Sequence, residues 1–304
     1  MLTMRDAFFY RVFEHAKKDP NIIVLTSDFS APSFDCFRKE LPNQFINTGI
    51  SEQNTILVAA GLAQSGKNVF VTSIAPFITM RCFEQIRLYV GDMNLNIKII
   101  AVGAGFSYNT AGPTHHSVED LAILRTIPNL RILSPSCNSR VIDFATWCVN
   151  NTCPIYVRLD RMTLDELYDN INCSEDNGCY VIKKAPIMIF STGYMVHTAI
   201  KAAQSSDIGV VDIYRIPLQI DSFLNIVSYC SKVITLEEHV FQGGLGSYIC
   251  EILNDNNILL PVKRFALDFS SGFCHSYGTR DEMHSTCGIG IDQLLSYIKD
   301  LIHV

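Results

Sequence analysis

The chain lacks the cysteine spacing of metal sites and the long apolar runs of membrane proteins. Its 304 residues include 11 scattered cysteines and no Cys-x-x-Cys pair, so no zinc site is expected. An odd cysteine number, with an N-terminal stretch that opens a helix instead of a signal peptide, predicts reduced thiols and a cytoplasmic location. No apolar run approaches a membrane span, so no membrane partner is expected.

Charge is also scarce. A net charge of −6, with 18% charged residues, gives no general attraction for nucleic acid or an anionic membrane. A hydrophobic content of 48% predicts a globular protein with much buried sheet. The glycine clusters 103–105 and 243–246 complete neither a P-loop nor a dinucleotide fingerprint, and packing turns are their simpler interpretation.

Helix-like and strand-like patterns alternate along the first half of the chain. Thr3 and Asp6 resemble a capping box for a helix that runs to about Lys18. Strands are predicted over 21–26, 69–72, 97–102, 130–133 and 155–159, and helices over 55–63, 77–90, from 117 and over 136–149. Strands that alternate with helices of this length indicate parallel crossovers and an α/β fold.

The alternation of helix-like and strand-like segments stops over residues 163–184, where acids and asparagines accumulate. A second alternating unit follows, with strands over 187–190, 208–212 and 233–236 and helices between and after them. We therefore expect two parallel-sheet α/β domains, spanning 1–165 and 186–304, joined by a linker over 166–185.

Three polar stretches are candidates for chemistry. In the turn 47–54, Gly49 suits a tight turn, Ser51 suits a helix N-cap, and Glu52 falls in the first helical turn, where a lone acid normally just complements the helix dipole. His115 and His116 occupy a loop after a strand, where open parallel sheets bind ligands, although adjacent histidines point apart and make a metal site a weak interpretation. Arg158 and Arg161 end another strand, either as surface cations or as a clamp for a phosphate.

Together these stretches resemble the C-terminal half of a transketolase, and the match covers essentially the whole chain in the family order. It would comprise a thiamine diphosphate pyrimidine-binding domain followed by the transketolase C-terminal domain. The motifs that carry the resemblance are Ile50–Asn54, Ala75–Phe77 with Arg81 and Glu84–Gln85, Gly112–His116 with Glu119–Ala122, and Glu237–His239 followed by Gly243–Gly246.

The resemblance implies thiamine diphosphate chemistry. Glu52 matches the glutamate that bonds a pyrimidine nitrogen and activates the cofactor for carbanion formation. Phe77 matches the aromatic residue that stacks on the aminopyrimidine, and Phe83 is expected to contribute a second ring face.

The resemblance also implies a sugar site. His115 matches a histidine that hydrogen-bonds the sugar and helps to move its protons, whereas a structural contact is expected for His116. Arg161, and less surely Arg158, match positions that grip a sugar phosphate, and Ser33 is expected to assist from the turn at 31–33.

Two departures from the family pattern stand out. The Gly-Asp-Gly motif that holds Mg²⁺ and the diphosphate is missing, so the chain resembles the small subunit of a split transketolase. The complete site would form with a separate diphosphate-binding subunit, as an α2β2 heterotetramer. Ala111 stands where typical transketolases carry an aspartate that reads a substrate hydroxyl, so the accepted ketose or aldose is expected to differ.

The expected activity is transfer of a two-carbon ketol unit between a ketose, expected to be phosphorylated, and an aldose. Three alternatives stay open at this level: a deoxyxylulose-phosphate-synthase-like protein, a 2-oxo-acid dehydrogenase beta subunit, and a non-catalytic paralogue. The first normally carries both halves in one chain, the second would need a lipoyl partner, and the third should have lost Glu52 or His115.

Overall fold

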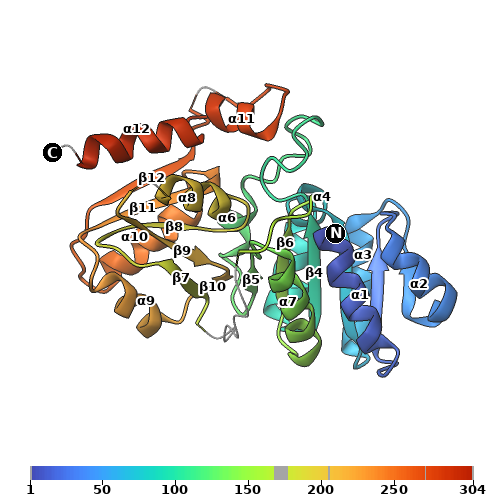
Figure 1. The fold of residues 1–304 in the computed structure, drawn as a ribbon. Helices are drawn as coiled ribbons and strands as arrows, with labels where there is room; N and C mark the ends of the chain where they lie inside the picture. Colours follow the sequence, from blue (N-terminus) through green and yellow to red (C-terminus); the bar gives the residue numbers. More distant parts are fainter. Residues whose placement is uncertain (1, 168–176, 205, 271, 303–304) are drawn as a thin grey trace. The chain divides into compact units, whose positions relative to one another are not determined.

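The computed structural model describes residues 2–167, 177–204, 206–270 and 272–302, and they form two compact units (Figure 1). The first unit comprises Met1–Ala104 and Ile123–Glu166, and the second comprises Gly105–Ala122 and Leu167–Val304. The predicted linker over 166–185 falls partly outside the described residues, at 168–176. The segment 105–122, which the sequence places in the first domain, packs with the second unit.

The first unit is built on a sheet whose strands run β5-β6-β4-β3-β1-β2, all parallel. Each of β1, β3, β4 and β6 is almost entirely buried, which explains the near-continuous apolar runs in the sequence. The strands are β1 Ile22–Thr26, β2 Phe45–Asn47, β3 Asn68–Ile74, β4 Ile97–Val102, β5 Arg131–Leu133 and β6 Ile155–Leu159.

Helices cover the first sheet, and α1 and α7 lie side by side on one face (Figure 1). Thr3 caps α1 as predicted, since its Oγ1 accepts a hydrogen bond from the Asp6 amide at 3.2 Å. The helical elements here are α1 Met4–Ala16, α2 Pro32–Glu40, η1 Pro42–Gln44, α3 Glu52–Gln64, α4 Ala75–Thr79, α5 Phe83–Gln85, the π-helix η2 Ile86–Asp92 and α7 Asn138–Asn150, and α6 is Asp120–Leu124.

The helix predicted over 77–90 is wrong in its continuity. The structure divides this stretch into α4, α5 and η2. Within α4 the Thr79 hydroxyl donates to the Ala75 carbonyl at 2.6 Å, and such side-chain bonds compete with regular helix geometry. A π-helix is rare and is frequent at functional sites, and here it follows closely on the turn that carries Arg81.

The second unit has the strand order β12-β11-β8-β9-β7, parallel except for β7, which pairs antiparallel with β9. The predicted α/β fold with parallel sheets is thus confirmed, with one antiparallel edge that the sequence pattern did not predict. The elements are β7 Cys179–Lys183, β8 Ile187–Ser191, α8 Met195–Ala203, β9 Ile208–Ile213, β10 Arg215–Ile216, α9 Ile220–Val227, β11 Lys232–Val240, α10 Leu245–Asp255, β12 Val262–Leu267, α11 Arg280–Thr286 and α12 Ile291–Ile302.

Successive residues of β8 point to opposite faces of this sheet, and helices cover both faces (Figure 1). Ile189 belongs to a buried cluster with Ala199 of α8 and Leu294 of α12. Phe190 lies on the other face, with its ring centroid 5.7 Å from that of Phe223 in α9. None of the helices in the described part of the chain has the length and apolar character needed to span a bilayer.

Candidate functional site

Glu52 is the first residue of α3, directly after the turn that leaves β2. Gly49 turns with φ +73°, a conformation that favours glycine. Ser51 holds the N-cap position as expected, but its hydroxyl donates to the Thr48 carbonyl at 3.0 Å and does not cap α3. The Glu52 side chain is 4% exposed, so the turn delivers a carboxylate into a buried position at a helix N-terminus.

A chain of hydroxyls underlies this turn. Thr55 Oγ1 lies 2.6 Å from Thr48 Oγ1 and 2.9 Å from Ser27 Oγ, and it also donates to the Ser51 carbonyl. These bonds join the end of β1 to the start of α3. They fix the backbone on which Glu52 is carried, and no motif in the sequence pointed to them.

Arg81 joins Glu52 to Phe77. Its Nη1 donates to Glu52 Oε2 at 2.8 Å, and its guanidinium carbon lies 4.7 Å from the centre of the Phe77 ring. Gln53 Nε2 donates to the Arg81 carbonyl at 3.0 Å, which holds the residue in place. The structure therefore brings together two predicted cofactor residues through a third residue that entered the sequence prediction only as part of a motif.

Beside this cluster, Cys82 is buried and Phe83 is half-buried. Burial raises the pKa of the Cys82 thiol to about 12, and the charge of Glu52 adds to the effect. The thiol therefore stays protonated at neutral pH and is not a nucleophile. The second ring face expected from Phe83 stays a prediction.

The candidate phosphate residues lie elsewhere in the first unit. Arg158 is 5% exposed within β6, opposite Ala101 of β4, and Arg161 is exposed just beyond the strand. Because β6 and β3 are separated by β4, these arginines stand about 10 Å along the sheet edge from the strand that precedes Phe77. Ser33 is fully buried, and its hydroxyl donates to Asp6 Oδ1 at 2.8 Å. The sugar-phosphate roles of all three residues stay predictions.

His115 belongs to the second unit, in a loop closed at its neck by Gly105 and Ser117, whose backbones exchange hydrogen bonds of 2.9 and 3.0 Å. The side chain is half-buried, with Nδ1 3.0 Å from Thr114 Oγ1. The Tyr108 ring centroid lies 5.8 Å from that of His115. The loop thus presents an imidazole at least partly to solvent, as a substrate contact requires.

His116 points into the second unit, where it is 4% exposed and packs edge-on against Phe106 at 4.8 Å. Burial lowers its pKa, which favours a neutral ring, and the nearby Glu238 carboxylate partly opposes the shift. This environment fits the structural contact expected for His116.

The glycine cluster 243–246 is a packing turn, as predicted. The Glu237 carboxylate accepts hydrogen bonds from the amides of Leu245 and Gly246, at 2.6 and 2.7 Å, and so satisfies the N-terminus of α10. A Cβ on Gly244 would overlap Glu237 Oε2, which explains the need for glycine. Glu237 is therefore structural.

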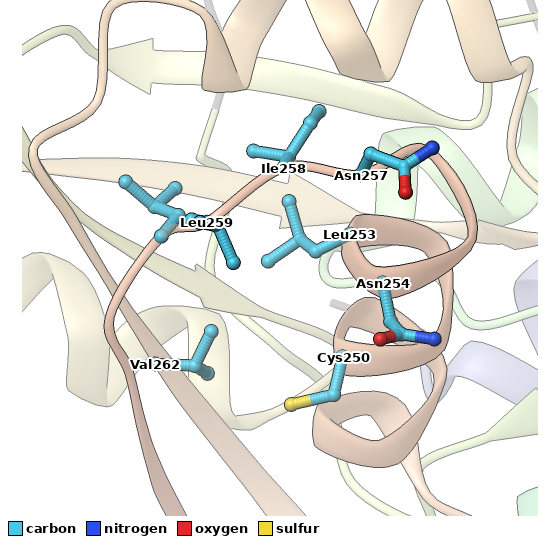
Figure 2. Close-up of a pocket in the computed structure, with 8 residues that line it drawn as sticks. Cys250, Leu253, Asn254, Asn257, Ile258, Leu259 and Val262 are labelled. Atoms are coloured by element: carbon cyan, nitrogen blue, oxygen red, sulfur yellow. The ribbon is translucent and has the colours of Figure 1, made fainter.

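A hollow of about 480 Å³ lies beside α10 (Figure 2). Its walls are mainly aliphatic, and the lining residues are Cys250, Leu253, Asn254, Asn257, Ile258, Leu259, Leu260 and Val262. Burial raises the pKa of the Cys250 thiol above its ordinary value. This lining offers no acid–base pair, and it contains none of the predicted site residues.

Within the described ranges, no group of three or more histidine, cysteine, aspartate or glutamate side chains is arranged to hold a metal ion.

The chain is similar to transketolases over both units. The transketolase pyrimidine-binding domain family matches residues 1–166, and the transketolase C-terminal domain family matches residues 180–273. An apulose-4-phosphate transketolase subunit of Phocaeicola vulgatus is 32% identical over 277 residues, which are 86% of this chain and 86% of that protein. A solved split gene transketolase, described as an inactive beta4 tetramer, is 28% identical with a TM-score of 0.84 and coverage of 98% and 97%.

A relative with another activity matches this chain over less than half of its own length. The 1-deoxy-D-xylulose-5-phosphate synthase of Halothermothrix orenii is 30% identical over 278 residues, but these are 87% of this chain and only 43% of that protein. The two domains define a transketolase-type pyrimidine-binding and C-terminal pair. The chain belongs to the transketolase family, and it corresponds to the C-terminal subunit of a split transketolase.

Proposed function

We propose that this subunit transfers a two-carbon ketol unit between a ketose phosphate and an aldose, with thiamine diphosphate activated by Glu52. The observation that carries the proposal is the arrangement of Glu52, Phe77 and Arg81. The buried Glu52 carboxylate and the half-buried Phe77 ring both contact the Arg81 guanidinium, which is a planar group that donates N–H bonds.

The aminopyrimidine of thiamine is also a planar group with polar ring nitrogens, so the residues fit it. The Arg81 guanidinium shows that a flat group can bond Glu52 and face Phe77 at the same time. Arg81 is 49% exposed at its side chain, so it can move outward, and because Glu52 is only 4% exposed the cofactor would have to replace the bond that Arg81 makes to the carboxylate.

When bound, the cofactor supplies a stabilised carbanion that can accept and donate a ketol unit. Glu52 would hold a proton at the pyrimidine nitrogen, and Phe77 would orient the ring. The low exposure of Glu52 keeps this contact away from bulk water, which strengthens its electrostatic interaction.

We assign the sugar to the remaining predicted residues. His115 would hydrogen-bond the sugar hydroxyls and carry protons, and Arg161 with Arg158 would bind its phosphate. Ser33 would assist only if its hydroxyl leaves Asp6. Ala111 brings no carboxylate to the loop, so we expect a preference different from that of enzymes with an acid there.

We further propose a separate diphosphate-binding subunit as partner, in an α2β2 heterotetramer. That subunit would supply the ligands of Mg²⁺ and of the cofactor diphosphate. None of the cysteines in the described ranges is joined in a disulfide, which fits assembly in a reducing compartment such as the cytoplasm. The deoxyxylulose-phosphate synthase alternative is not favoured, since its relative is a single chain more than twice as long as the matched region.

The test follows the proton that Glu52 is proposed to control. In the assembled enzyme, the rate of deuterium exchange at C2 of the bound thiazolium is measured by NMR for Glu52→Gln and for the control Glu40→Gln, an exposed carboxylate at the end of α2. We expect Glu52→Gln to slow the exchange at least about 100-fold and the control to leave it unchanged, in line with general acid–base contributions. Equal exchange in both variants would refute the assignment of Glu52.

A further inference from the structure

Glu238, one residue beyond the helix-capping Glu237 in β11, is a buried carboxylate in an ionic cluster. It is 6% exposed, and its two oxygens accept bonds from Arg280 Nε and Nη2, the first at 2.8 Å. His284 Nε2 also bonds Glu238 Oε1. Burial alone would raise the pKa of Glu238, but the Arg280 guanidinium holds that pKa well below its usual range, so the group is an anion at all ordinary pH values.

The partners of Glu238 come from one face of α11. Arg280 and His284 are four residues apart and therefore lie on the same side of the helix. The helix start is fixed by a capping box between Thr279 and Glu282. The Arg280 guanidinium also lies 3.7 Å from the centre of the Tyr194 ring, at the start of α8. The cluster therefore joins β11, α8 and α11.

The Glu238 carboxylate also lies against Gly105, at the base of the loop 105–117 that carries His115. A Cβ on Gly105 would overlap Glu238 Oε2, and Gly105 has φ +60°, so the backbone approaches the charge as closely as only glycine allows. Gly105 pairs with Ser117 across the neck, and the Val240 amide donates to the Val118 carbonyl at 2.9 Å. The two ends of the loop are thus fixed to β11.

The far side of the loop is held by the residues just before α11. Asn109 Nδ2 donates to the Gly278 carbonyl. The Tyr277 hydroxyl lies 2.9 Å from the position that a Cβ on Gly112 would take, three residues before His115. The segment 277–284 therefore contacts the loop at Asn109 and Gly112, and Glu238 anchors that segment through Arg280.

We propose that Glu238 is a positioning residue for His115: through Arg280 and His284 it holds the segment 277–284 against the loop 105–117 and so fixes the imidazole for the sugar. The inference rests on the proposed role of His115. In the sequence, Glu238 contributed only to a motif that resembles the family, and no pattern predicted a role for residues 277–284.

The first experiment measures the loop directly, with no dependence on activity. Hydrogen exchange of the full chain is followed by mass spectrometry for Glu238→Gln, for Arg280→Lys, and for the control Asp281→Asn. The control removes an exposed charge from the same helix and leaves the capping box between Thr279 and Glu282 intact. We expect amide exchange over 109–116 to rise about 10-fold or more in Glu238→Gln, less in Arg280→Lys and not in the control.

The second experiment asks whether the effect acts through His115. In the enzyme assembled with its partner, Glu238→Gln should lower kcat/KM about 10- to 100-fold, as expected when a catalytic contact is displaced. In a His115→Ala background the same change should cost less than about 2-fold, because coupled residues are not additive.

Two results would overturn the positioning role. One is faster exchange spread equally over β8 and β9, which would make Glu238 a general stabiliser. The other is an undiminished loss in the His115→Ala background. If Glu238→Gln fails to fold, Arg280→Lys is judged by the same two criteria. If His115→Ala leaves the sugar kinetics unchanged while the loop exchange responds as expected, the proposed role of His115 is refuted. The positioning of the loop 105–117 by Glu238 is then still supported.

Discussion

Lys98 offers a prediction that can be worked out from its surroundings. It lies in β4 at the centre of the first sheet, is 0% exposed, and donates from Nζ to Asn96 Oδ1. Burial lowers its pKa from 10.5 to about 8. The folded chain therefore resists protonation of this amine, and we expect Lys98→Met to stabilise the protein near neutral pH.

The magnitude follows from the shift in pKa. A difference of about 2.5 units at about 1.4 kcal/mol per unit means that keeping the buried amine charged costs about 3 kcal/mol at pH 7. Loss of the hydrogen bond to Asn96 offsets about 1 kcal/mol, which leaves a gain of about 2 kcal/mol in the variant. Because the folded pKa is the lower one, the unfolded chain binds more protons between pH 8 and 10.5, so wild-type stability relative to the variant rises with pH.

The assay is thermal unfolding of wild type, Lys98→Met and the exposed control Lys39→Met at pH 7 and pH 10. We expect Lys98→Met to raise the Tm by about 4 °C at pH 7, and the difference to fall to near zero at pH 10, where the cost of the charge is only about 1 kcal/mol. The control should show neither change. A gain that is absent at pH 7, or one that does not depend on pH, would refute the assigned cost of the buried amine.

Three further predictions concern the site. Glu52→Ala should abolish ketol transfer and leave the Tm nearly unchanged, and substantial turnover would contradict the role of Glu52. Arg161→Ala should raise the KM for a phosphorylated sugar by the equivalent of about 1–3 kcal/mol, and an unchanged KM would mean that the phosphate is held elsewhere. Ala111→Asp should shift the kcat/KM ratio toward ordinary ketose phosphates, whereas an unchanged ratio would show that position 111 does not read a substrate hydroxyl.

Much of the fold could be predicted because buried parallel strands leave a clear mark on a sequence. The apolar runs at 97–102 and 155–159 became β4 and β6 with unchanged bounds. The turn at 47–54 likewise placed Glu52 at the start of α3, because a glycine turn and a polar N-cap residue are local signals.

One miss overlooked a local signal, and the other arises where a distant contact decides the structure. The turn predicted at 31–33 is the start of α2, since Pro32 occupies the first helical position that suits proline. The antiparallel edge strand β7 lies in a stretch that the polar pattern assigned to a linker.

The candidate site likewise combines residues that local motifs identify with contacts that only the fold reveals. Glu52 and His115 were found from motifs, but the bond from Arg81 to Glu52 spans 29 residues and the pair of Glu238 with Arg280 spans 42. Neither pairing has a periodic signal. Only the folded chain shows that the segment 105–122 is held by Glu238 and groups with the second unit.

The most direct test of the central claim is reconstitution of ketol transfer. The chain is assayed alone, and then mixed with a transketolase subunit that carries the Gly-Asp-Gly motif, with thiamine diphosphate, Mg²⁺, a ketose phosphate donor and an aldose acceptor. We predict activity only in the mixture. Transfer by this chain alone would contradict a split site, and a mixture that forms a complex, binds the cofactor and transfers no ketol unit from any ketose phosphate would contradict the transketolase assignment.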